Sequence, residues 1–169
     1  QKALFDQEYE NPYDKNGPNV VFVGNSRFDF DFLERAATLF PEWKFHIIGP
    51  IGNISGHKNV LTYGEMPFKD TIPYIKFADI GLHTLSYSVG SESFTDSLKV
   101  IQYTYCKLPI VAPDFMKNNR RVHMFYYKPG DSVSIENALN HAIKFDHSKI
   151  VADDVYTWDE LAKKLLEGS

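Results

Sequence analysis

The chain has 169 residues, enough for one ordinary domain and too few for two. Its 18 Lys and Arg against 22 Asp and Glu give a formal charge of −4, which argues against a general nucleic-acid binder. No apolar run approaches the ~20 residues that cross a bilayer. The single cysteine, Cys106, excludes an internal disulfide and suits a reducing compartment. Because the chain does not begin with Met, we expect it to be a piece of a larger protein.

The predicted elements alternate along the chain. Residues 1–18 are polar and contain two prolines and a glycine, so we predict a linker or crossing segment there and a folded domain over 19–169. Short apolar runs predict strands at residues 19–24, 44–49, 59–63, 79–84, 109–112 and 123–127. Helical spacing predicts helices at residues 28–40, 67–77, 96–106, 131–145 and 158–166. This order indicates an α/β fold, a Rossmann-like parallel sheet of about six strands with helices on both faces.

The first predicted strand ends at a glycine, in the turn Gly24-Asn25-Ser26. In open parallel sheets ligands bind at the carboxyl ends of the strands, and a glycine there lets the backbone approach a ligand closely. The turn lacks the glycines of a dinucleotide fingerprint, and the chain has no P-loop motif, which argues against NAD binding and P-loop hydrolysis. A simple tight turn explains Gly24 equally well.

Residues 84–97 contain five Ser and two Thr and lead into a predicted helix that begins near Asp96. A helix N-terminus after such a loop is a ready anion site. Lys99 falls in the first helical turn, where a cation gains nothing from the helix dipole, so it suits a bound phosphate. Gln102 projects from the same side of the helix as Lys99. The alternative is an exposed Lys–Gln pair opposite an apolar stripe of Leu98, Ile101 and Tyr105.

The order of these segments resembles the carboxyl-terminal domain of GT-B glycosyltransferases, which binds a nucleotide-sugar donor. Over residues 19–145 it is similar in particular to bacterial glucuronosyltransferases of surface polysaccharide synthesis. The resemblance rests on Gly24 with Phe28-Asp29, Phe45 to Gly49, Val60 with Tyr63 to Met66, Thr71 to Lys76, and Asp96 to Lys99 with Gln102-Tyr103. It implies one half of a GT-B fold.

The resemblance also implies the site and the reaction. The residues expected to contact the donor nucleotide are Gly24, Asn25, Ser26, Ser97, Leu98, Lys99 and Gln102, with Lys99 and Gln102 on the UDP part. Retaining GT-B families carry two Glu where this chain has Phe94 and Gln102, so an inverting transfer is expected. The UDP-sugar is a substrate, and neither a cofactor nor a metal is implied.

The remaining partners follow from the same resemblance. We expect the catalytic base and the site for a lipid-linked or glycan acceptor in an amino-terminal domain that this chain lacks. The full protein is then expected in the cytoplasm, or bound peripherally to the inner face of the cell membrane. Two alternatives stay open: half of a nucleotide-sugar epimerase, and a non-enzymatic flavodoxin-like binding module without affinity for UDP.

Several further residues are weaker candidates. A small basic cluster suits a diphosphate, a sugar carboxylate or anionic lipid, and suits a solvated loop better: Lys117, Arg120, Arg121 and Lys128. Most of the 13 Phe and 10 Tyr are expected in the core, with Tyr87, Phe94 and Tyr103 as candidates to line a cleft. The six His show no metal-ligand spacing, and those inside strands, His46 and His83, are expected to be structural.

Overall fold

The computed structural model describes residues 2–14, 16–25, 27–52, 54, 56–88, 98–117, 120–153 and 155, and residues 160, 163, 166 and 167 beyond them. Six strands form one sheet in the order β3-β2-β1-β4-β5-β6, and every neighbouring pair is parallel. The strands are β1 Asn19–Val23, β2 Lys44–Ile48, β3 Val60–Gly64, β4 Ile80–Leu82, β5 Ile110–Pro113 and β6 Met124–Tyr127. The predicted six-stranded α/β fold is confirmed.

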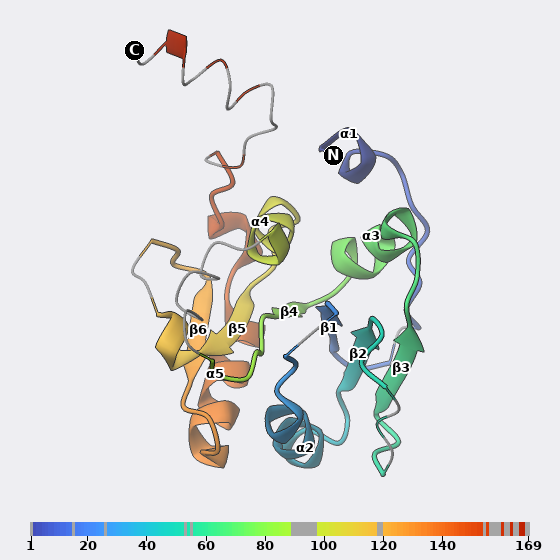
Figure 1. The fold of residues 1–169 in the computed structure, drawn as a ribbon, viewed down its shortest axis with the longest axis vertical. Coiled ribbons are helices and arrows are strands. Elements are labelled where there is room, and N and C mark those ends of the chain that lie inside the picture. The colour runs from blue at the N-terminus through green and yellow to red at the C-terminus, as the bar shows by residue number, and fades with distance from the viewer. Residues whose placement is uncertain are drawn as a thin grey trace.

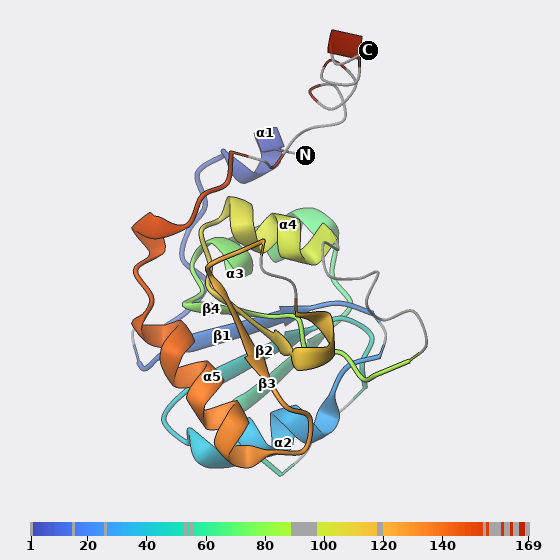
Figure 2. The same ribbon diagram turned by 90° about the vertical axis from the view of Figure 1, so that its left-hand side faces the viewer.

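Helices cover both faces of this sheet (Figure 1 and Figure 2). On one side lie α2 Phe30–Leu39 and α5 Ser132–Lys144, and on the other lie α3 Phe68–Lys76 and α4 Leu98–Tyr105. Three short helical turns complete the described elements: α1 Lys2–Phe5, η2 Asp114–Met116 and η3 His147–Lys149. The helix predicted at 158–166 lies almost entirely outside the described residues. Among the helices that the structure describes, none has the length and apolarity needed to cross a membrane.

The strands are continuous apolar runs because the sheet is buried on both faces. In β1, Val20 and Phe22 pack into the cluster beneath α2 and α5, while Val21 packs into the cluster beneath α3 and α4. Alternate residues of a strand point to opposite faces, so a strand between two helical layers needs apolar residues at successive positions. These two clusters form the core.

The centre of the sheet contains the point where the strand order reverses. β1 pairs with β2 over five residues, but it pairs with β4 over two, Val20 with Ile80 and Val21 with Gly81. Beyond Gly81 each of the two strands pairs only with its other neighbour: Val23 of β1 pairs with Ile48 of β2, and Leu82 of β4 pairs with β5. The carboxyl ends of β1 and β4 therefore separate, and in sheets of this kind ligands bind in such a crevice.

The amino-terminal segment packs against the domain. Phe5 and Tyr13 are buried, and the Lys76 ammonium on α3 donates hydrogen bonds to the carbonyl oxygens of Phe5 (2.7 Å) and Gln7 (2.9 Å). Residues 2–14 thus belong to the hydrophobic layer over α3, although the sequence predicts a separate segment up to residue 18. That residues 1–18 form a linker in a longer protein stays a prediction.

Candidate functional site

The pairing of β1 with β4 stops after Val21 and Gly81, and the region between the carboxyl ends of these strands, called the crevice below, is followed by the loops that leave them. Phe28 and Leu85 form an isolated antiparallel bridge, and the Asp29 N–H donates to the carbonyl oxygen of Thr84 at 3.0 Å. The Arg27 guanidinium, from a residue with a φ of 53°, donates to the Ser88 hydroxyl. The two loops that start at the switch point are therefore held together just beyond it.

Lys99 places its ammonium at the carboxyl end of β1. The Nζ lies 3.8 Å from the centroid of the Phe22 ring, and a Cβ at Gly24 would lie 2.8 Å from the same Nζ. Phe22 belongs to the cluster beneath α2 and α5, whereas α4 covers the other face of the sheet. The Lys99 side chain therefore reaches across the end of the sheet, from one helical layer to the other.

The ammonium of Lys99 has no polar partner in the described part of the chain. Neither a hydrogen bond nor an ion pair to its Nζ occurs among the described residues, and its one favourable contact is the cation–π contact with Phe22. The side chain keeps some exposure along its length, but burial around the ammonium lowers the pKa of Lys99 to about 7. A buried cation without a counter-charge is costly, and the described residues supply none to Lys99, which makes it a candidate group for binding an anion.

Gly24 and Gly49 make this arrangement sterically possible. Gly49 has a φ of 136°, and a Cβ on it would lie 1.7 Å from the carbonyl oxygen of Gly24, so the ends of β1 and β2 are in close contact. At Gly24 itself, a Cβ would meet both the Lys99 ammonium and the Phe22 ring. The sequence predicts that the backbone at Gly24 approaches a ligand closely; in the structure this backbone lies close to the Lys99 ammonium.

Tyr103 holds α4 against the crevice. Its hydroxyl accepts a hydrogen bond from the Val23 N–H at 3.2 Å and lies 3.2 Å from the carbonyl oxygen of Leu82. The ring packs against Gly81, where a Cβ would lie 2.6 Å from the ring Cδ2. Tyr103 is fully buried, and burial raises the pKa of its hydroxyl. The prediction that Tyr103 lines an open cleft is therefore wrong.

The buried side of α4 also differs from the predicted one. The helix buries Val100, Tyr103 and Thr104, while Leu98 is 57% exposed, so the predicted apolar stripe of Leu98, Ile101 and Tyr105 is not the face that packs. The Tyr103 ring fits against Gly81 and its hydroxyl satisfies the backbone of the parting strands. These two contacts of Tyr103 set the rotation of α4 about its axis and bring the Lys99 ammonium to the carboxyl end of β1.

The other predicted site residues do not all lie at this edge of the sheet, because Arg120 and Arg121 precede β6 and so lie toward the amino-terminal ends of the parallel strands. Gln102 is partly buried on α4, and Asn25 is exposed directly after Gly24. Tyr87, 62% exposed, follows β4 and meets the Phe115 ring edge-on at 5.2 Å between centroids. The predicted basic residues lie on separate stretches: Lys117 follows η2, Arg120 and Arg121 precede β6, and Lys128 follows it. Ser26, Ser97 and Phe94 lie outside the described residues.

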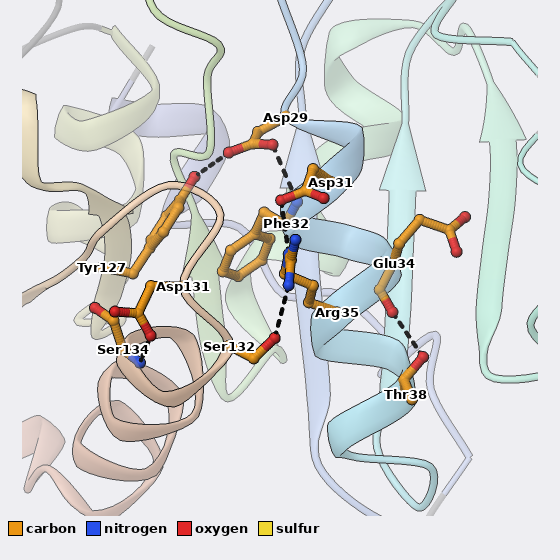
Figure 3. Close-up of polar contacts among 10 residues, drawn as sticks. All are labelled: Asp29, Asp31, Phe32, Glu34, Arg35, Thr38, Tyr127, Asp131, Ser132 and Ser134. Carbon is orange, nitrogen blue, oxygen red and sulfur yellow. Dashed lines mark hydrogen bonds and ion pairs between the residues drawn. The ribbon is translucent and has the colours of Figure 1, made fainter.

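Asp29 is the one carboxylate that is buried among the described residues, and both of its oxygens are used (Figure 3). One oxygen accepts from the Phe32 N–H at 3.0 Å and caps α2, and the other accepts from the Tyr127 hydroxyl at 2.8 Å. Nearby, Arg35 in the middle of α2 binds both Asp31 and Ser132, so α2 is tied to the N-terminal end of α5. Asp29 is thus a structural group rather than a free base.

Sequence reasoning missed Phe22 and Arg27 as parts of this site. The sequence predicts Phe22 to be a core residue of a strand. Its cation–π contact with the Lys99 ammonium is seen only in the structure. Arg27 carries no motif, and its positive φ is a feature of the folded loop. Within the described ranges, no group of three or more His, Cys, Asp and Glu is placed to hold a metal ion.

Comparison with known proteins agrees with this fold. No family model matches the chain. The chain is 31% identical over 159 residues to the UDP-glucuronate:glycolipid 2-beta-glucuronosyltransferase of Xanthomonas campestris pv. campestris, covering 92% of the chain and 39% of that protein. The glycosyltransferase GlyE of Streptococcus pneumoniae TIGR4 superposes with a TM-score of 0.53 over 81% of this chain and 35% of GlyE, at 15% identity. The chain is similar to one half of a GT-B glycosyltransferase.

A second solved structure shares the fold. A putative UDP-N-acetylglucosamine 2-epimerase from Listeria monocytogenes superposes with a TM-score of 0.58 over 98% of this chain and 48% of the epimerase, at 10% identity. At such identities the likeness extends to the fold alone. The resemblance to the GT-B donor-binding half that the sequence predicts is confirmed, and the chain spans about two fifths of the length of its curated relative.

Proposed function

We propose that this chain is the donor-binding domain of an inverting, UDP-sugar-dependent glycosyltransferase of bacterial surface polysaccharide synthesis. One observation carries the proposal: the ammonium of Lys99 lies over Phe22 at the switch point of the sheet and has no polar partner among the described residues. The curated relative, a transferase that by its name uses UDP-glucuronate and a glycolipid, supports the choice of reaction. Glucuronosyl transfer to a lipid-linked acceptor is the matching proposal for this protein.

In this proposal, Lys99 binds the diphosphate of the donor. A diphosphate placed beside the Nζ provides the counter-charge that the described residues do not supply, and it raises the fraction of Lys99 that is protonated. Gly24 leaves the space beside the ammonium open, because any side chain there would contact it. Gln102, three residues further along α4, presents an amide that can both donate to and accept from ribose hydroxyls.

In the proposed reaction an acceptor hydroxyl attacks the anomeric carbon of the donor sugar. The bond from that carbon to the β-phosphate oxygen breaks, and its electron pair leaves with UDP. Protonated Lys99 stabilises the charge that grows on the diphosphate, which is electrostatic help from a group already in place. The proton of the acceptor goes to a base that we place outside this chain, since both oxygens of Asp29 are already used.

Calorimetric titration of UDP into the 169-residue chain tests this proposal. We expect binding by the natural chain and a 10- to 100-fold weaker affinity in Lys99→Ala, about what one charged hydrogen bond contributes. Lys76→Ala is the matched control, because the Lys76 ammonium is already bound to two carbonyl oxygens and lies on α3. Absence of heat at millimolar UDP, or equal affinity in Lys99→Ala, contradicts the proposal.

The epimerase is the second candidate, because a putative epimerase shares the fold. Its likeness at 10% identity concerns the fold, whereas the curated relative at 31% identity is a transferase. Both enzymes bind a UDP-sugar, so UDP titration does not separate them. Product identification in the full-length protein does: a transferase needs an acceptor, and an epimerase releases sugar without one.

A further inference from the structure

The position of Lys99 depends on how α4 is attached to the sheet. Of the residues on this helix, Val100, Tyr103 and Thr104 are buried. Tyr103 follows Lys99 by four residues, so the two side chains leave the helix on the same side. Tyr103 therefore attaches to the sheet the side of α4 from which Lys99 projects.

The hydroxyl of Tyr103 lies where the pairing of β1 with β4 stops. The Val23 N–H donates to this hydroxyl at 3.2 Å, and the carbonyl oxygens of Leu82 and Val21 lie 3.2 Å and 3.4 Å from it. Buried backbone groups need such partners, and the two strands no longer supply them to each other beyond Gly81. The hydroxyl joins the strands while keeping their ends apart.

The ring of Tyr103 fixes the distance between α4 and the sheet. Ring atoms lie 2.6, 2.7 and 2.9 Å from the place where a Cβ on Gly81 would be. Real Cβ atoms do not sit so close to their neighbours, so a side chain at position 81 would push the ring and its helix away. Gly81 and Tyr103 are thus matched to one another.

We propose that Tyr103 is a positioning residue of this site: its hydroxyl, held between β1 and β4, keeps the crevice open and sets the Lys99 ammonium at the end of β1. The proposal rests on the proposed function for its ligand, a nucleoside diphosphate. Tyr103 itself is fully buried and acts through Lys99. Its removal should change both the affinity for the diphosphate and the surroundings of the lysine.

Tyr103→Phe is the direct test, with UDP as the probe. We expect UDP to bind about five- to tenfold more weakly, because the loss of one buried anchor lets α4 shift. In NMR spectra of the chain with ¹³C-labelled lysines, the pKa of Lys99 should rise from about 7 toward its ordinary value as water reaches the ammonium. Tyr105→Phe removes a hydroxyl from the same helix that bonds Asp6 at 2.6 Å, and it should leave both quantities unchanged.

Equal UDP affinity and an equal Lys99 titration in Tyr103→Phe and the natural chain would overturn the inference. If the natural chain does not bind UDP, the proposed function fails, and the Lys99 titration still decides whether Tyr103 positions the lysine. If Tyr103→Phe does not fold, Gly81→Ala takes its place. It keeps the hydroxyl but displaces the ring, and a folded Gly81→Ala with an unchanged Lys99 titration also overturns the inference.

Discussion

His46 and Lys99 are both titratable side chains buried near β1, and their surroundings differ completely. The His46 ring bonds the Tyr63 hydroxyl through Nδ1 at 2.7 Å and the side-chain oxygen of Asn19 through Nε2 at 2.9 Å. The centroid of its ring also lies 4.4 Å from that of the Tyr13 ring, with the two planes tilted by 44°. The Lys99 ammonium faces the Phe22 ring and, among the described residues, bonds no polar group. The polar groups of His46 are therefore satisfied within the fold, whereas no described residue satisfies the ammonium of Lys99.

Burial lowers the pKa of both groups, so a shifted pKa does not by itself separate them. The pKa of His46 falls to about 4, mainly through burial and also through Lys44, so the ring is neutral and both nitrogens are used. The pKa of Lys99 falls to about 7 through burial alone. The two groups differ instead in their partners, since both ring nitrogens of His46 are bonded and Lys99 has no polar partner among the described residues.

Of the substitutions that test this comparison, replacing His46 should have the largest effect on stability. We expect His46→Leu to lower the free energy of unfolding by about 2–4 kcal/mol, because Tyr63 and Asn19 both lose a hydrogen-bond partner in a buried place. Denaturant unfolding at pH 7 measures this loss. The affinity of the folded variant for UDP should stay unchanged, because His46 lies in the middle of β2, whereas the Lys99 ammonium lies at the carboxyl end of β1.

The pH dependence of stability provides the control for His46. Its pKa is lower in the folded chain than its ordinary value of 6.5, so the unfolded chain binds more protons between these values. The natural chain should therefore lose stability as the pH falls from about 6.5 to 4, and His46→Leu should lose less over that interval. An equal loss in the two proteins would show that His46 is not held neutral by the fold.

Lys99→Met should have the opposite effect on stability. We expect a gain of about 1–3 kcal/mol at pH 7 in the absence of ligand, because the substitution removes a buried ammonium that has no polar partner among the described residues. The folded pKa of about 7 lies below the ordinary 10.5, so the cost of Lys99 is full below pH 7 and vanishes above 10.5. The gain in Lys99→Met should shrink over the same interval.

Lys76→Met is the matched control for this gain. Its ammonium donates to the carbonyl oxygens of Phe5 and Gln7, so its removal should destabilise the chain rather than stabilise it. Thermal unfolding of the two variants at pH 7 and pH 10 compares them directly. A Lys99→Met chain that is as unstable as Lys76→Met would mean that Lys99 has a structural partner after all.

The fold could be predicted from the sequence because its signals are local. Continuous apolar runs such as residues 19–23 belong to strands buried on both faces, and all six predicted strands occur. The short turn α1 at residues 2–5 escaped prediction because its surroundings are polar. It is held by Phe5 in the core and by Lys76, contacts that come from distant parts of the chain.

The site could be predicted in part, and for a different reason than the structure provides. Lys99 is predicted from its place in the first turn of a helix, whereas the structure sets it apart by burial without a partner. His46 is predicted to be structural, and its two hydrogen bonds confirm this. The roles of Tyr103 and Gly81 depend on where β1 and β4 part, which no local pattern encodes.

The most direct measurement is a pH titration of the Lys99 side chain by NMR, with and without UDP. We predict that Lys99 titrates near pH 7 in the free chain, and that saturating UDP raises its pKa, because the diphosphate supplies a counter-charge that the described residues do not. A titration near the ordinary value of 10.5 in the free chain, or a pKa unmoved by bound UDP, would contradict the account.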